Sequence, residues 1–225
     1  MKRAALLLVF LIPNLLSMRA SAWTRASDQR IAKKAAALAP SDLRTLIEHF
    51  NSDYQVGLAR AEASEGDAAL RRQIEAETSN AISIVRTRKP MSDLVEHLGV
   101  LAHLVADANT PAPARGDFEE YFERRMPKFP TVFYGLDTNF NVPRYFDRTF
   151  RRTSRFGPLV DSEYARAERS EAFDDRSTAF GVASVCYSHA VTDLVNLYYY
   201  IWKEAGGDVR SATGLRRGNL LLHEN

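Results

Sequence analysis

The chain carries a histidine and an aspartate four residues apart, His103 and Asp107, within the stretch GVLAHLVADANTPAPARGDFEEYFE. On an α-helix, positions i and i+4 lie on one face, so the imidazole and the carboxylate can point at the same object. Both groups are good zinc ligands, but two ligands do not hold a zinc ion. The spacing predicts either part of a metal site or a simple hydrogen bond between the two side chains.

A second pair with the same spacing, His189 and Asp193, lies in the last apolar stretch of the chain. Two interpretations are open. The pair is either a buried polar pair that is satisfied by its neighbours, or it faces His103 and Asp107 across the core and completes a mixed site.

These pairs need helices to position them, and the apolar residues recur at helical spacing along most of the chain. We expect helices within 24–40, 41–59, 66–89 and 91–108, shorter ones near 144–152 and 161–170, and a long one from 177 to the Gly206-Gly207 stop. Prolines and glycines become frequent from residue 109 on, and residues 125–143 predict an ordered loop. The last long stretch is apolar on nearly all sides, which is typical of a central core helix. The sequence therefore predicts one all-α domain over residues 23–210, followed by a tail, 211–225.

Residues 1–22, MKRAALLLVFLIPNLLSMRASA, have the pattern of a signal peptide: Lys2 and Arg3, an apolar run, and a small-residue cleavage site, Ala20-Ser21-Ala22. An uncleaved anchor is the alternative, but the run is shorter than the roughly 20 residues of a spanning helix. We expect export to the periplasm or the cell exterior, a mature chain that begins at Trp23, and no transmembrane segment in that mature chain.

Removal of the predicted signal takes the formal charge from +2 to −1, since it carries three basic residues and no acidic one. The mature charge therefore gives no reason to expect a nucleic acid partner. The one cysteine, Cys186, excludes an internal disulfide, and its apolar surroundings predict a core residue.

The segment HLVADANTP resembles the central motif of the zinc-dependent phospholipase C family, which includes the fungal single-strand nucleases. That motif reads His-x-x-Gly-Asp-x-Asn-x-Pro-x-His at the end of a core helix. The residues that match in register are His103, Asp107, Asn109 and Pro111. Ala106 replaces the glycine, and Pro113 stands where the final histidine would be. The resemblance implies an all-α fold like that of zinc-dependent phospholipase C.

In the family resembled, the mature chain begins with tryptophan, whose free amine and carbonyl oxygen chelate a zinc ion. Trp23 follows the predicted cleavage point, Asp28 stands near the place of a histidine ligand, and Glu62 stands near that of an aspartate. The resemblance thus implies one or two zinc ions held by Trp23, Asp28, Glu62, His103 and Asp107. Where two ions are bound, Asp107 bridges them. Because the set is rich in oxygen, another divalent metal is an alternative.

The function that this resemblance implies is an exported, metal-dependent phosphoesterase with a reduced metal site. Its substrate would be a phosphodiester, with a phospholipid as one candidate. Asp107 would hold the metal, and Glu62 would act as general base or as a ligand. The alternative is a catalytically inactive exported protein of the same fold with a binding or structural role, since most of the family's histidines are missing.

Overall fold

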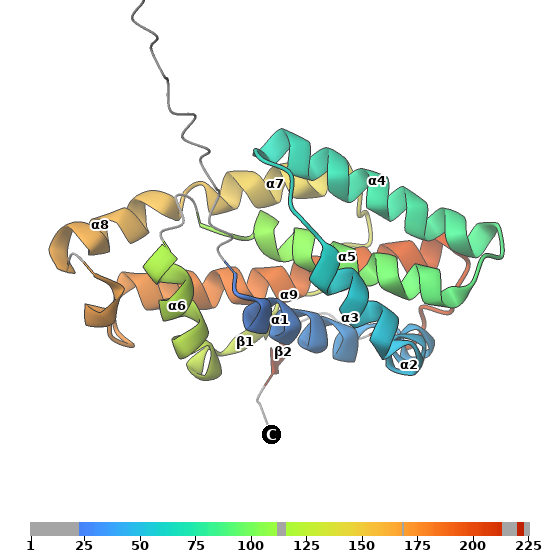
Figure 1. Cartoon of the computed structure of the whole chain (residues 1–225), viewed down its shortest axis with the longest axis horizontal. Helices are drawn as coiled ribbons and strands as arrows, with labels where there is room; N and C mark the ends of the chain where they lie inside the picture. Colours follow the sequence, from blue (N-terminus) through green and yellow to red (C-terminus); the bar gives the residue numbers. More distant parts are fainter. Residues whose placement is uncertain (1–22, 112–115, 168, 213–219, 223–225) are drawn as a thin grey trace, which may run out of the picture.

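The computed structural model describes residues 23–111, 116–167, 169–212 and 220–222, and it consists of helices around one long core helix (Figure 1). The helices are α1 (Arg25–Leu38), α2 (Ser41–His49), α3 (Asn51–Arg60), α4 (Asp67–Arg86), α5 (Met91–Ala108), α6 (Gly116–Arg125), α7 (Val142–Thr153), α8 (Gly157–Ala167) and α9 (Thr178–Glu204). Two short 3₁₀ turns, η1 (Met126–Lys128) and η2 (Ser170–Ala172), and two strands, β1 (Thr131–Phe133) and β2 (Leu220–Leu222), complete it. The prediction of a mainly helical fold is confirmed.

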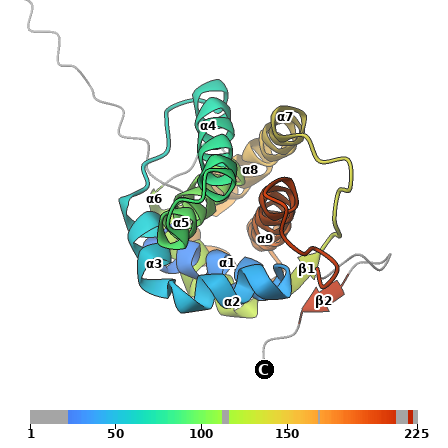
Figure 2. The same ribbon diagram turned by 90° about the vertical axis from the view of Figure 1, so that its right-hand side faces the viewer.

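The core helix is α9, which lies between α4 and α7 on one side and α1 and α2 on the other (Figures 1 and 2). Ser177 caps its start by accepting a hydrogen bond from the Phe180 amide, and Gly206, at φ 86°, follows its end. Cys186 is fully buried in this helix, and burial raises the pKa of its thiol to about 12. No helix in the described residues has the length and apolar character to span a membrane.

The helix that carries His103 and Asp107, α5, is positioned by a close crossing with α3. Gly57 of α3 and Gly99 of α5 lie at this crossing, where a Cβ on Gly57 would overlap the carbonyl oxygen of Glu96. Deeper in, the Tyr198 hydroxyl of α9 donates to the carbonyl of Leu98 at 2.9 Å. The hydroxyl groups of Tyr198 and Tyr54 are 2.6 Å apart, so one buried chain of hydrogen bonds joins α3, α5 and α9.

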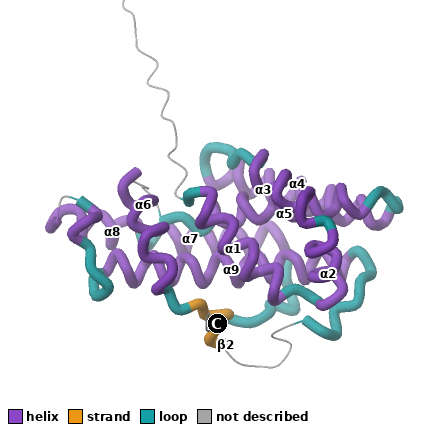
Figure 3. The backbone as a smooth tube through the Cα atoms, turned by 60° about the horizontal axis from the view of Figure 1, so that its bottom comes forward, coloured by secondary structure: helices purple, strands orange, loops and turns teal. Residues whose placement is uncertain are grey.

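The structure differs from the sequence expectations in three places. The helix expected over 41–59 is broken at Phe50, whose φ of −104° and ψ of 37° separate α2 from α3. Helix α6 lies in the proline- and glycine-rich stretch that begins at 109, where no helix was expected. Strand β2 lies within the predicted tail and pairs antiparallel with β1, with Val132 opposite Leu221 (Figure 3).

Candidate functional site

His103 and Asp107 share one face of the last two turns of α5, as their spacing predicts. His103 Nε2 lies 3.7 Å from Asp107 Oδ2, and both side chains are mostly buried. This distance is too long for a hydrogen bond, so the alternative of a simple His–Asp hydrogen bond does not describe the pair. The two groups can still contact one small object between them.

Asp28, from the first turn of α1, contacts the other nitrogen of the same imidazole. Its Oδ2 lies 2.7 Å from His103 Nδ1, and its second oxygen, Oδ1, is buried with no hydrogen-bond partner among the described residues. Burial raises the pKa of Asp28 to about 6, against the opposing effect of the hydrogen bond to His103. Asp28 therefore orients the ring and leaves Nε2 toward Asp107, the arrangement found behind many metal-bound histidines.

The protonation of His103 follows from its two carboxylate neighbours. Burial alone would lower the pKa of this imidazole, but the hydrogen bond to Asp28 and the charge of Asp107 together raise it above its ordinary value. The cluster thus contains more negative charge than the imidazole alone can balance, which favours a bound proton or another cation.

A third carboxylate, Glu119 of α6, belongs to this region and was not among the predicted ligands. Burial, followed by the charges of Asp107 and Glu120, raises its pKa to about 7. Its Oε1 is buried and has no hydrogen-bond partner within the described part of the chain. In the sequence Glu119 is one of several acidic residues in GDFEEYFERR, and the only hint of a role is that an acidic segment follows the central motif.

Trp23 lies next to the same elements. Its side chain is buried, and its ring meets Phe122 of α6 edge to face, with ring centroids 3.9 Å apart. Phe122 is three residues after Glu119 and shares its face of α6. Trp23 is also next to Thr24, which caps the helix that carries Asp28. The residue predicted to begin the mature chain therefore lies between two elements that supply carboxylates to the cluster.

Glu62, in contrast, is not brought into this cluster. It is exposed in the loop between α3 and α4, where its backbone carbonyl accepts a hydrogen bond from Gln73 at 2.8 Å. Its charge is not among the causes of the pKa shifts of Asp28, His103 or Glu119. The structure gives no support for Glu62 as a metal ligand or general base.

As a metal site the cluster is incomplete. Within the described residues, no three His, Cys, Asp or Glu side chains converge as a bound metal ion requires. The donor types nevertheless fit a divalent ion: His103 Nε2 and the Asp107 carboxylate face each other, and buried oxygens of Asp28 and Glu119 have no hydrogen-bond partner among the residues described. The ligands would be drawn from His103, Asp107 and the main chain of Trp23, with the Glu119 carboxylate near Asp107.

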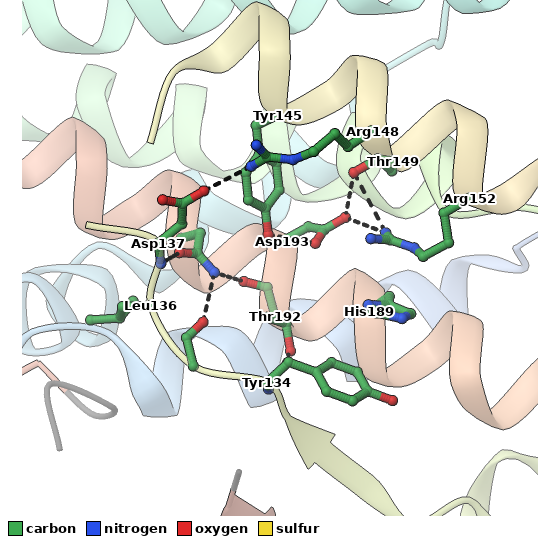
Figure 4. Close-up of a pocket in the computed structure, with 12 residues that line it drawn as sticks. Tyr134, Leu136, Asp137, Tyr145, Arg148, Thr149, Arg152, His189, Thr192 and Asp193 are labelled. Carbon is green, nitrogen blue, oxygen red and sulfur yellow. Dashed lines mark hydrogen bonds and ion pairs between the residues drawn. The ribbon is translucent and has the colours of Figure 1, made fainter. Parts of the chain in front are cut away.

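The second predicted pair, His189 and Asp193, lines a pocket between α7 and α9 (Figure 4), and neither residue is among the causes of the pKa shifts of Asp28, His103 or Glu119. Asp193 is 1% exposed and accepts hydrogen bonds from four side chains: Tyr145 at 2.8 Å, Thr149 at 2.9 Å, Arg152 at 2.8 Å and Asn109 at 3.1 Å. The interpretation of a buried group satisfied by its neighbours therefore holds for Asp193. Asn109, which matches the family motif, is used here as a structural link: it donates to Asp193 and accepts from Arg152 at 2.8 Å.

His189 makes no hydrogen bond with any described residue and stacks instead on Tyr134, with ring centroids 4.4 Å apart. Burial lowers its pKa to about 4, and the nearby charge of Arg152 adds to this effect. The imidazole is therefore neutral at physiological pH.

No protein-family model matches this chain, and no curated protein matches it in sequence.

Proposed function

We propose that this protein is an exported, metal-dependent phosphoesterase of the phospholipase C type, with its metal site around His103 and Asp107. The observation that carries the proposal is the position of the His103 ring, held at Nδ1 by Asp28 while Nε2 faces Asp107. A zinc ion or a similar divalent ion there would neutralise the charge of a phosphodiester and lower the pKa of a bound water.

The roles of the protein groups follow from their surroundings. Asp28 accepts a hydrogen bond from His103 Nδ1–H, which leaves the lone pair of Nε2 available as a ligand. Asp107 supplies a carboxylate on the same helix face. Glu119, with a pKa near neutral, is suited to take a proton from the attacking water, the role that the sequence suggested for Glu62. The free amine of Trp23, exposed by signal cleavage, would be a further ligand.

The first test measures metal content by plasma mass spectrometry on protein processed to begin at Trp23. The matched control has one extra alanine before Trp23, which removes the free amine from that residue. We expect about one or two equivalents of metal in the processed protein, and less in the control, because the amine and carbonyl of Trp23 form a chelate. Absence of metal from the processed protein, after dialysis against zinc and against manganese, would contradict the proposal.

The second test is Asp107→Asn, which we expect to abolish both metal binding and phosphodiester hydrolysis because it removes a ligand carboxylate. Glu119→Gln should retain most of the metal and lower kcat by about 10²–10⁴-fold, the usual contribution of a general base. The control is Glu123→Gln, an exposed position on α6 whose charge is not among the causes of the raised pKa of Glu119, and this variant should behave as wild type. Hydrolysis that survives in Asp107→Asn would rule out this assignment.

In the part of the chain that the structure describes, the ligand side chains do not form a group of three, which favours one other candidate, a catalytically inactive exported protein of the same fold. In that case a chelator would lower the melting temperature while phosphodiesters, phospholipids included, stay intact in the metal-loaded protein.

A further inference from the structure

A surface pocket of about 280 Å³ lies between the segment 134–137, α7 and α9 (Figure 4). Its wall from α7 includes Arg148 and Arg152, and its wall from α9 includes His189. Tyr134 covers one face of the His189 ring. The volume is near the lower end of the usual range for ligand pockets, so it suits a small molecule.

The two carboxylates in the wall of this pocket, and the side-chain oxygens of Thr192 and Asn196, already accept hydrogen bonds. Asp193 accepts four hydrogen bonds, as described above. Asn196 Oδ1 accepts from the Asp137 amide at 2.6 Å, and Thr192 Oγ1 accepts from the Tyr134 amide at 3.2 Å. The Asp137 carboxylate accepts from the Asn139 amide at 3.0 Å and from Arg148 at 2.7 Å. A bound molecule would therefore find few strong acceptors free in this wall.

The donors, in contrast, are only partly used. In the described residues Arg152 makes its hydrogen bonds through Nη2 alone, and its Nε is buried with no partner. Arg148 uses Nη2 for its pair with Asp137, and its guanidinium lies over the Tyr145 ring. His189 makes no hydrogen bond within the described chain. A guanidinium has five N–H donors, so both arginines keep donors for a ligand.

We propose that this pocket binds a small oxyanion, a phosphate or a carboxylate group, through Arg148, Arg152 and His189. Planar guanidinium groups bind such oxyanions through paired, charge-assisted hydrogen bonds, and two of them lie one helical turn apart on α7. Asp193 holds Arg152 in place and accepts hydrogen bonds from three other side chains as well. The site is therefore preorganised before a ligand binds. The inference does not rest on the metal cluster or on phosphoesterase activity.

The test is isothermal titration calorimetry of the full chain from Trp23, with inorganic phosphate in one arm and succinate in the other. Both arms contain EDTA and low salt, so that phosphate cannot bind through a metal ion. We expect saturable binding of at least one anion below about 10 mM. The arm that binds more tightly identifies whether the pocket prefers phosphate or carboxylate.

Two variants of equal charge separate this pocket from general attraction to a basic helix. Arg148→Ala should weaken binding at least fivefold, since Arg148 lines the pocket. Arg151→Ala removes the same charge from an exposed position on α7 outside the pocket, and should change the affinity less than twofold. Equal affinities of the Arg148→Ala and wild-type proteins, or no binding of either anion at 20 mM, would overturn the proposal.

A third variant tests the histidine without disturbing the stack. His189→Phe keeps an aromatic ring against Tyr134 and removes both ring nitrogens, so we expect weaker anion binding with an unchanged fold by circular dichroism. Arg152 is not the first choice for substitution, because its loss would leave the buried Asp193 carboxylate with one fewer donor and could unfold the protein.

Discussion

His103 has a carboxylate near each nitrogen of its ring, and this is the main chemical feature at the scale of single residues. Asp28, on α1, fixes the ring at Nδ1. Asp107 lies near Nε2 and belongs to α5, one turn after His103. A ring held in this way has one nitrogen for support and one for a ligand, so its tautomer is determined before anything binds.

The pocket histidine leads to a prediction about pH. The pKa of His189 falls from 6.5 to about 4 in the folded protein, so between these values the unfolded chain binds more protons. This residue therefore makes the fold less stable as the pH drops from about 6.5 to about 4. His189→Gln should remove that contribution, so the variant should gain stability relative to wild type at pH 4.5 compared with pH 7.5, as measured by urea unfolding. An identical difference at both pH values would contradict the lowered pKa.

The sequence indicated some residues of the site and not others, for a physical reason. His103 and Asp107 could be paired because helical spacing is a local property. Asp28 was considered through the family resemblance, and the structure brings it to His103. Glu119 reaches the cluster only through the packing of α6, which no spacing rule describes. Glu62 was suggested by its place in the family resemblance, and the structure leaves it exposed in a loop away from the cluster.

At the scale of elements, the crossing of α3 and α5 depends on two glycines that let the backbones touch. Gly57→Ala would force a methyl group into the carbonyl of Glu96, so we expect a loss of about 1–3 kcal/mol in the free energy of unfolding, or more if α5 cannot shift. The measurement is chemical denaturation.

The control for this prediction is Gly181→Ala on α9, where an added Cβ meets no atom within 4 Å. Alanine has a better helix propensity than glycine, so this change should raise stability by up to about 1 kcal/mol. A similar loss at both positions would mean that the close crossing is not the cause.

Helices with long apolar stripes were predictable, and elements defined by distant contacts were not. The expected 91–108 helix agrees with α5 because its apolar residues recur without interruption. The break at Phe50 falls inside a continuous helical pattern, and α6 lies among glycine and proline residues that favour a loop. Strands β1 and β2 are three residues each and pair across a large separation in sequence, so no local alternation could reveal them.

At the scale of the whole molecule, the cluster of Asp28, His103, Asp107 and Glu119 makes the stability of the fold depend on pH and on the proposed bound cation. The pKa values of Asp28 and Glu119 are raised to about 6 and about 7, so between about pH 4 and pH 7 the folded state holds more protons than the unfolded state. These residues therefore make the metal-free protein less stable as the pH rises through this range. A bound cation would replace the protons and reverse the effect.

We expect EDTA to lower the melting temperature more at pH 8 than at pH 5, because at pH 5 protons already neutralise the cluster. The Asp28→Asn, Glu119→Gln double variant should show little difference between the two pH values. Calorimetric scans of both proteins, with and without EDTA, provide the measurement. An equal effect of EDTA at pH 5 and pH 8 in the wild type would argue against a cation at this cluster.

The burial of Cys186 within α9 makes its thiol a natural probe of how often the core around this helix opens. Its thiol is fully enclosed and has a pKa of about 12, so a thiol reagent cannot modify it while the core helix stays packed. The rate of labelling in native buffer would then measure how often the centre of the molecule opens, with no engineered probe. Loss of a bound metal or anion could be followed through the same single atom.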